Sequence, residues 1–227
     1  MASNSIKQKR TGTFWISSEI STTNFDANIL GNLRPPNLDR AAWVLVGGRS
    51  SRMGTDKARV ESGGRALALR VADQAAAACA TVSLVGDPAI YSELGLPVVA
   101  DRFPGQGPLA GIEAALGTTN CDANLIVACD MPAIRENLLE ELFAAAEDCD
   151  CSLPRQGDGR LEPLCAVYRK RCHPVIRAAL EQGVRRVTDA LQRMAQEGLA
   201  IRYVRVSDPT LFANLNTPED WRRYHHG

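Results

Sequence analysis

The feature that most constrains this fold is a regular alternation of short apolar runs with helical segments, which begins at residue 41. The apolar runs that read as strands are residues 42–46, 81–85, 97–100, 124–129, 150–153, 164–168 and 201–206. The segments that predict helices are residues 66–80, 89–94, 109–116, 135–147, 174–181, 187–197 and 217–224. This alternation predicts an α/β fold in three layers, a mostly parallel, twisted sheet with helices on both faces.

Residues 1–40 differ in composition from the rest of the chain. They are rich in Ser, Thr and Asn, and their apolar residues follow no period. Because such a segment has little to bury, we expect a disordered N-terminal extension, followed by a single domain over residues 41–227. Residues 11–20 are too polar for the apolar part of an export signal. A transit peptide and an early start site are further interpretations of this segment.

The charge balance and the cysteines restrict the partners and the compartment. Formal net charge is zero, which favours neither nucleic acid nor an acidic membrane surface as a partner. No apolar run approaches the ~20 residues that span a bilayer. The chain has seven cysteines, an odd number, and no Cys-x-x-Cys pair. We therefore predict buried thiols rather than disulfides or a zinc site, and a reducing, cytoplasmic location.

The first apolar run ends in a glycine-rich loop that carries fixed positive charge. Gly47 and Gly48 let the backbone approach a ligand closely, and loop amides can point at phosphate oxygens. Arg52 and Lys57 can stabilise charge that develops on the α-phosphate and pyrophosphate of a nucleoside triphosphate. The spacing matches neither a Walker loop nor the dinucleotide fingerprint, so the loop alone is also compatible with an ordinary surface loop.

Two aspartates follow later apolar runs, and the carboxyl ends of parallel strands meet at one edge of a sheet. Asp130 is predicted to bind Mg²⁺, with a helix cap as the alternative. Asp101 is placed similarly, but Arg102 can neutralise it. A second glycine-rich loop opens a helix at Gly107 and Pro108, and its amides can contact a base or ribose. A flexible linker is the competing interpretation of that loop.

Together these motifs resemble those of the molybdenum cofactor guanylyltransferases, the MobA-type nucleotidyltransferases. The resemblance extends from about residue 41 to the end. It rests on Leu45-Val46-Gly47-Gly48, Arg52-Met53-Gly54, Asp56-Lys57, Gly107-Pro108-Leu109-Ala110-Gly111, Cys129-Asp130-Met131-Pro132, Glu162-Pro163-Leu164 with Tyr168, Gly183 with Arg185-Arg186, and Asn214-Leu215-Asn216-Thr217-Pro218-Glu219. It implies a Rossmann-like fold of the nucleotide-diphospho-sugar transferase type.

The resemblance also implies a reaction and a set of site residues. GTP and molybdopterin-bound molybdenum cofactor would give the guanine dinucleotide cofactor and pyrophosphate, with Mg²⁺ on Asp130. The implied nucleotide contacts are Leu45, Val46, Gly47, Gly48, Lys57, Asp101 and Asp130. The implied molybdopterin-side residues are Arg185, Arg186, Asn214 and Asn216. Other proteins of molybdenum cofactor biosynthesis or molybdoenzyme maturation are further candidate partners.

The chain departs from the family pattern at two positions. Val46 stands where members often have Ala, and Gly86 falls where some members have a side-chain amide near the base. The alternatives are a cytidylyltransferase, a sugar- or polyol-phosphate nucleotidyltransferase, and a nucleotide-binding regulatory module without turnover. The two glycine-rich loops favour the guanine branch. The presence of Arg52, Lys57 and Asp130 together favours an enzyme over a regulatory module.

Overall fold

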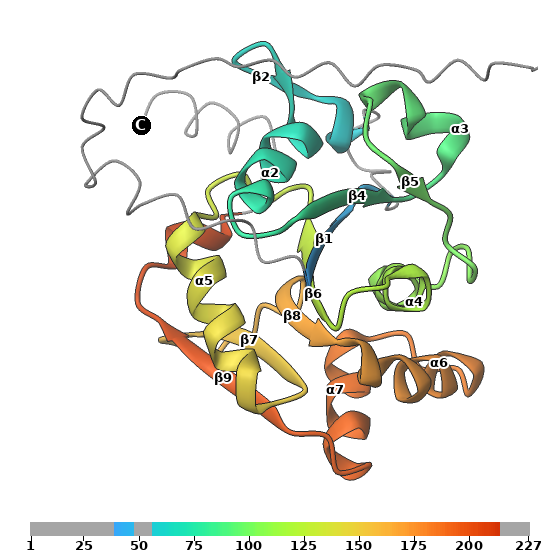
Figure 1. Ribbon diagram of the computed structural model, residues 1–227, viewed down its shortest axis with the longest axis vertical. Helices are drawn as coiled ribbons and strands as arrows, with labels where there is room; N and C mark the ends of the chain where they lie inside the picture. Colours follow the sequence, from blue (N-terminus) through green and yellow to red (C-terminus); the bar gives the residue numbers. More distant parts are fainter. Residues whose placement is uncertain (1–38, 48–55, 214–227) are drawn as a thin grey trace, which may run out of the picture. The chain divides into compact units, whose positions relative to one another are not determined.

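The computed structural model describes residues 39–47 and 56–213, which all belong to one compact unit (Figure 1). The main sheet consists of β1 (Arg40–Leu45), β4 (Thr81–Val85), β5 (Val98–Val99), β6 (Ala123–Ala128), β7 (Cys151–Gln156), β8 (Cys165–Arg169) and β9 (Ile201–Val206). The α-helices are α2 (Leu67–Ala76), α3 (Pro88–Tyr91), α4 (Pro108–Thr118), α5 (Glu136–Ala145), α6 (His173–Glu181) and α7 (Val187–Gln196). The helix expected at residues 217–224 lies outside the described residues.

The strands of the main sheet follow the order β5-β4-β1-β6-β8-β7-β9. Neighbouring strands are parallel except at β8, which is antiparallel to both β6 and β7. The connection between β7 and β8 contains only residues 157–164, which is too short for the crossover that a parallel pair needs. The predicted mostly parallel sheet is therefore confirmed, with one reversed strand whose beginning lies at the carboxyl edge of the others.

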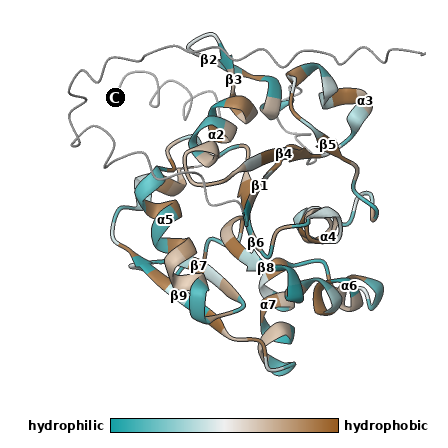
Figure 2. Ribbon diagram, in the orientation of Figure 1, coloured by the Kyte–Doolittle hydropathy of each residue, from teal (hydrophilic) through white to brown (hydrophobic). Residues whose placement is uncertain are grey.

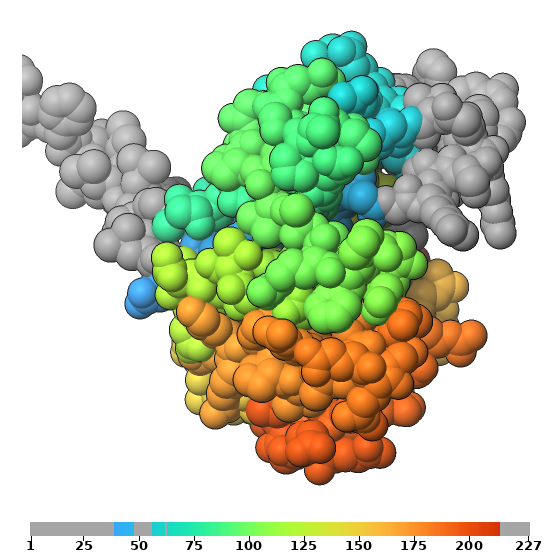
Figure 3. Space-filling view, turned by 90° about the vertical axis from the view of Figure 1, so that its right-hand side faces the viewer, coloured from blue at the N-terminus to red at the C-terminus, as the bar shows by residue number. Residues whose placement is uncertain are grey.

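Helices cover both faces of the sheet, as the alternating pattern predicts. Ala42 and Val44 of β1 face a core that contains the inner sides of α2 and α5. Trp43 and Leu45 face a second core that is shared with α4, α6 and α7. The apolar colour in Figure 2 lies along the strands and the helix sides that face them. In Figure 3 the surface of α6 and α7 lies directly against that of α4.

Two local boundaries differ from the sequence expectation. Helix α2 ends at Ala76, although the helix-favouring run continues to Ala80. The N–H of Ala80 donates to the carbonyl oxygen of Arg40 at 3.1 Å, because the chain must turn here to enter the sheet as β4. A turn at Gly63 and Gly64 joins a small hairpin of β2 (Glu61–Ser62) and β3 (Arg65–Ala66) that the pattern of apolar runs did not indicate.

The first strand begins slightly earlier than the sequence indicates. The carbonyl oxygen of Asp39 accepts the N–H of Ala123, and β1 starts at Arg40. The Arg40 guanidinium lies 2.9 Å from a carboxylate oxygen of Glu140 and 4.2 Å from the ring centre of Phe143. Asp39 and Arg40 therefore contribute to the sheet, although the composition assigns them to the extension. The disorder of the preceding residues stays a prediction.

The cysteines are free thiols, and six of the seven are buried. Burial raises the pKa of Cys79, Cys129, Cys165 and Cys172 to about 12. These thiols stay protonated at neutral pH and pack as small apolar groups, as predicted. Within the described ranges, no helix has both the length and the apolar character that crossing a membrane would require.

Candidate active site

The predicted site residues lie at the edge where four parallel strands end (Figure 1). Gly47 follows β1, Gly86 follows β4, Asp101 follows β5 and Asp130 follows β6. Residues from distant segments of the chain are therefore brought to one edge of the sheet, as parallel pairing requires.

Lys57 and Asp130 meet at this edge. Lys57 begins the short 3-10 helix η1 (Lys57–Arg59), which Asp56 caps by accepting the N–H of Ala58 at 3.1 Å. Ala58 is fully buried and anchors the helix in the core. The Nζ of Lys57 lies 3.6 Å from Oδ2 of Asp130, and the two side chains are 20% and 22% exposed. A partly exposed pair at this distance can turn toward a ligand, the ammonium to a phosphate and the carboxylate to a cation.

Asp130 fits Mg²⁺ as a single protein ligand. Its position is fixed because the N–H of Cys129 donates to Leu45 at 3.2 Å and the next side chain, Met131, is buried. Over residues 39–47 and 56–213, no group of three or more His, Cys, Asp or Glu side chains is arranged to hold a metal ion. A nucleotide site needs no such group, since phosphate oxygens and water complete the coordination of Mg²⁺ around one or two carboxylates.

Asp101 has a different environment. Its Oδ1 accepts the N–H of Phe103 at 2.7 Å, so one carboxylate oxygen already shapes the loop before α4. Burial raises the pKa of this carboxyl, and the charge of Glu113 adds to the rise. Among the described residues, the carboxylate that pairs with Arg102 is the fully buried Glu113, at 2.9 Å, and not Asp101 as the sequence suggested. Asp130 remains the better candidate for the metal.

The second glycine-rich loop is positioned tightly against the sheet. Gly107 precedes α4 with a φ of +80°, which L side chains rarely adopt, and Pro108 occupies the first turn. A Cβ added to Gly111 would lie 3.1 Å from a methyl group of Leu45. The absence of that atom lets α4 approach β1 closely. The first turn of the helix thus lies beside the end of β1.

Comparison with known proteins agrees with this geometry. Residues 42–195 match the model of the MobA-like NTP transferase domain. The chain belongs to this family. It is 38% identical over 190 residues to a probable molybdenum cofactor guanylyltransferase of Pelotomaculum thermopropionicum, a match that covers 81% of this chain and 90% of the relative. It is 35% identical over 191 residues to the molybdenum cofactor guanylyltransferase of Vibrio atlanticus, covering 82% and 95% of the two chains.

Solved structures support the same assignment. Molybdopterin-guanine dinucleotide biosynthesis protein A from Archaeoglobus fulgidus is 28% identical, with a TM-score of 0.69 over 82% of this chain and 96% of that one. The 2-C-methyl-D-erythritol 4-phosphate cytidylyltransferase of Thermus thermophilus shares the fold, with a TM-score of 0.62 at 16% identity over 81% and 96% of the two chains. The predicted fold and the predicted nucleotidyltransferase class are thereby confirmed.

The two departures from the family pattern belong together. A Cβ added to Gly86 would lie 2.7 Å from Cγ2 of Val46 and 2.9 Å from the ring of Tyr91. Real Cβ atoms essentially never come this close to their neighbours, so Val46 occupies the space that a side chain at residue 86 would need. Val46 and Tyr91 together therefore leave no room for a side chain at residue 86.

The predicted molybdopterin-side residues are described only in part. The Arg185 guanidinium donates to the carbonyl oxygens of Leu180 and Val184 at 3.1 and 3.0 Å, so it caps the end of α6. Arg186 is exposed just before α7. The backbone oxygen of Arg185 would lie 3.9 Å from a Cβ on Gly107, which brings this segment beside the second loop. Gly48, Arg52, Asn214 and Asn216 lie outside the described residues, and their roles stay predictions.

One polar residue at this edge was given no role from the sequence. Glu162 is only 9% exposed and lies just before β8, the reversed strand. Burial raises the pKa of its carboxyl, and the negative charge of Asp130 raises it further. A hydrogen bond from Gln156 lowers the pKa, but by less than burial raises it. The signal in the sequence was the motif Glu162-Pro163-Leu164 with Tyr168, but its place at this edge depends on the reversal of β8.

Proposed function

We propose that this protein transfers GMP from GTP to the terminal phosphate of molybdopterin-bound molybdenum cofactor and releases pyrophosphate. The observation that carries the proposal is the Lys57–Asp130 pair beside the end of β1, in a chain of the MobA-like family. The names of the relatives favour guanylyl transfer over the cytidylyl alternative. The free thiols suit a reducing compartment, and we place the reaction in the cytoplasm.

The chemistry needs positioning and charge stabilisation more than proton transfer. An oxygen of the acceptor phosphate forms a bond to the α-phosphorus, and the bond from that phosphorus to the pyrophosphate oxygen breaks with its electron pair. The acceptor phosphate is already anionic at neutral pH, so no general base is required. Lys57 stabilises the charge that develops on the phosphate oxygens. Mg²⁺ held by Asp130 would supply further neutralisation of that charge.

The guanine preference follows from hydrogen-bond complementarity. Guanine presents a carbonyl acceptor beside two donors, N1–H and the exocyclic amine. Backbone groups at the end of β1 and around Gly107 can offer an amide donor and carbonyl acceptors to this edge. Adenine would leave buried polar groups unpaired, at about 1–3 kcal/mol each, so two mismatches correspond to roughly a hundredfold preference. Gly86 supplies no side-chain contact to the base, so we expect a weaker preference for guanine than in members that have a side-chain amide at this position.

Pyrophosphate release tests the proposal directly. The protein is incubated with Mg²⁺ and GTP, CTP, ATP or UTP, with and without molybdenum cofactor. We expect release that requires both GTP and the acceptor. Faster release with CTP would assign the chain to the cytidylyl branch. Tight nucleotide binding by calorimetry without release would indicate a regulatory module.

A further inference from the structure

A small pocket opens at the carboxyl edge on the far side of Asp130 from Gly47. It has a volume of about 270 Å³, and its lining comes from the starts of α4, β8 and α7 and from the loop after β6: Pro108, Met131, Glu162, Pro163, Leu164, Val187 and Thr188. Small-molecule sites typically measure about 300–1,000 Å³, so this pocket suits a single ring system rather than a whole nucleotide.

The walls are mostly apolar, with one buried carboxylate among them. Glu162 is more than nine-tenths buried. Its N–H donates to Pro154 at 3.1 Å and its carbonyl oxygen accepts the N–H of Cys165 at 3.0 Å, so its backbone is held from both sides. Gln156 donates its side-chain amide to Oε1, and within the described ranges it is the one residue hydrogen-bonded to this carboxylate.

A carboxylate can accept about four hydrogen bonds. Oε1 of Glu162 accepts one from Gln156, and Oε2 is not enclosed by the protein, so a ligand in the pocket that brings N–H donors can bind there. The apolar walls add a preference for a flat ring. An aminopyrimidinone, which carries an amino group beside a ring N–H, matches both requirements, since the two donors can bind the two oxygens of one carboxylate.

The order of strands decides which substrate meets this carboxylate. Both guanine and a pterin carry the aminopyrimidinone edge. Gly47 and Gly86 follow β1 and β4, on one side of Asp130, whereas Glu162 lies in the loop just before β8 and Gln156 ends β7, on the other side. The glycine-rich loop that we assign to the triphosphate follows β1 in the chain. The Glu162 carboxylate therefore lies on the side of Asp130 away from β1, which we assign to the acceptor, and Pro108 at the start of α4 borders the pocket toward the loop that we assign to guanine.

We propose that Glu162 is the specificity-determining residue for the acceptor, and that its carboxylate accepts hydrogen bonds from the 2-amino group and adjacent ring N–H of the pterin. This inference rests on the proposed function, because it takes the acceptor to be a pterin. Gln156 is a positioning residue that fixes the orientation of the carboxylate.

A pair of simple ligands tests the inference without turnover. Pterin and lumazine are similar fluorescent bicycles, but lumazine has a carbonyl oxygen where pterin has the 2-amino group. We expect the unmodified protein to bind pterin about tenfold or more tightly than lumazine in fluorescence titrations. Glu162→Gln should reduce this ratio to about one. Glu197→Gln, an exposed residue at the other end of α7, removes the same charge and should leave the ratio unchanged.

Steady-state kinetics show whether Glu162 contacts the pterin of the acceptor or the guanine of GTP. In Glu162→Gln, the KM for the acceptor should rise about ten- to hundredfold while the KM for GTP stays within about twofold. A rise confined to GTP would assign Glu162 to guanine, and an unchanged pterin-to-lumazine ratio would also overturn the inference. Absence of acceptor-dependent pyrophosphate release by the unmodified protein would instead contradict the proposed function. Melting curves and the milder Glu162→Asp identify any effect that comes from misfolding.

Discussion

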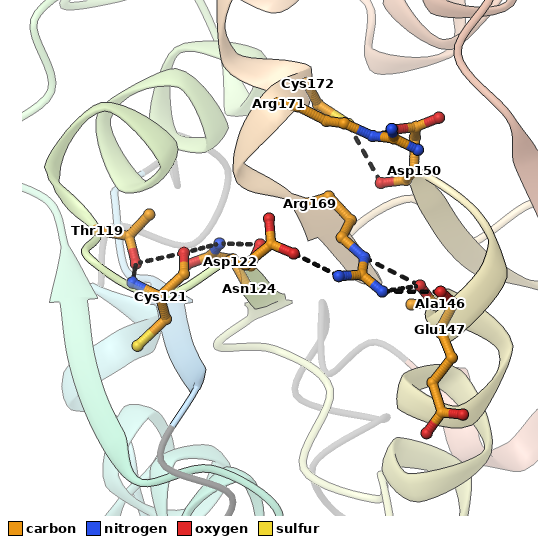
Figure 4. A network of polar contacts seen from close by, with 10 residues as sticks. All are labelled: Thr119, Cys121, Asp122, Asn124, Ala146, Glu147, Asp150, Arg169, Arg171 and Cys172. Atoms are coloured by element: carbon orange, nitrogen blue, oxygen red, sulfur yellow. Dashed lines mark hydrogen bonds and ion pairs between the residues drawn. The ribbon is translucent and has the colours of Figure 1, made fainter.

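The polar side chains at the two edges of the sheet differ in how fully they are bound within the fold. At the amino edge, Arg169 donates to the carbonyl oxygens of Ala146 and Glu147 at 3.0 and 2.9 Å and also pairs with Asp122 (Figure 4). At the carboxyl edge, Lys57 and Asp130 lie 3.6 Å apart and remain partly exposed. The polar groups named at the first edge are satisfied within the fold, whereas Lys57 and Asp130 at the second remain accessible, and we propose that they exchange partners with a ligand.

Asn124 shows how complete the satisfaction at the amino edge is. Its side chain is fully buried, accepts the indole N–H of Trp43 at 3.1 Å, and donates to the carbonyl oxygens of Cys121 and Asp122 at 3.1 and 3.0 Å. Asp150 nearby accepts the N–H of Ala200 at 2.8 Å and pairs with Arg171. Substitutions at the amino edge should therefore lower stability, and substitutions at the carboxyl edge should lower activity.

The largest expected effect is on turnover at the carboxyl edge. Replacing Lys57 with Ala should reduce the rate of pyrophosphate release a hundredfold or more at saturating GTP, because one stabilising contact to transition-state charge contributes about 3 kcal/mol. The melting temperature should stay within a few degrees. Turnover near the unmodified rate would remove Lys57 from the chemistry.

Asp130 and Asp101 offer a matched pair of carboxylates at strand ends. Asp130→Asn should weaken the Mg²⁺ dependence and turnover strongly, because the amide is a poor ligand for this cation. Asp101→Asn should have a smaller effect, since one of its oxygens already serves the loop at Phe103. Mg²⁺ titrations of pyrophosphate release compare the two variants. Equal or reversed effects would contradict the assignment of the metal to Asp130.

Asn124→Ala tests the amino edge. The substitution leaves the buried indole N–H of Trp43 and two carbonyl oxygens without their partner, which should destabilise the protein by about 3 kcal/mol. The melting temperature should then fall by roughly 6–12 °C. The KM for GTP and the turnover of the folded fraction should not change, and a selective loss of activity would break the division between the edges.

The close approach of Val46 to Gly86 predicts non-additive substitutions. Gly86→Asn should destabilise the protein by about 2 kcal/mol, because its Cβ would overlap Val46 and Tyr91. Val46→Ala combined with Gly86→Asn should recover part of this loss and sharpen the preference for GTP over ATP. A double-mutant cycle by thermal unfolding measures the coupling. Strictly additive effects would show that the two positions are independent.

The smallest effects concern the N-terminal residues. Deleting residues 1–38 should leave the melting temperature and turnover unchanged, because their sequence has no periodic apolar face. Deleting residues 1–40 should lower the melting temperature by a few degrees, since it removes Arg40 from Glu140 and Phe143. If the shorter deletion alone destabilises the protein, the segment packs on the domain.

The local pattern of apolar runs was sufficient to predict several strands with their bounds. The bounds of β4 and β9 agree with the apolar runs at residues 81–85 and 201–206. The first of these runs ends at Gly86-Asp87-Pro88, where turn-forming residues mark the boundary. The sequence pattern mispredicted the ends of elements where contacts with distant parts of the chain set the boundary. The sheet stops α2 at Ala76, and β7 continues to Gln156 by pairing with β9.

The alternation of apolar runs and helical segments predicted the α/β class, and the general rule of parallel pairing predicted that Gly47, Asp101 and Asp130 reach one edge of the sheet. The motifs predicted the family. Only the tertiary structure decided which charges meet. Lys57 faces Asp130, Arg102 is paired with Glu113, and Arg185 caps α6. It also placed Glu162 at the carboxyl edge of the sheet, through the reversal of β8. The physical reason is that side-chain partners far apart in the chain are selected by packing and strand order, which no local pattern encodes.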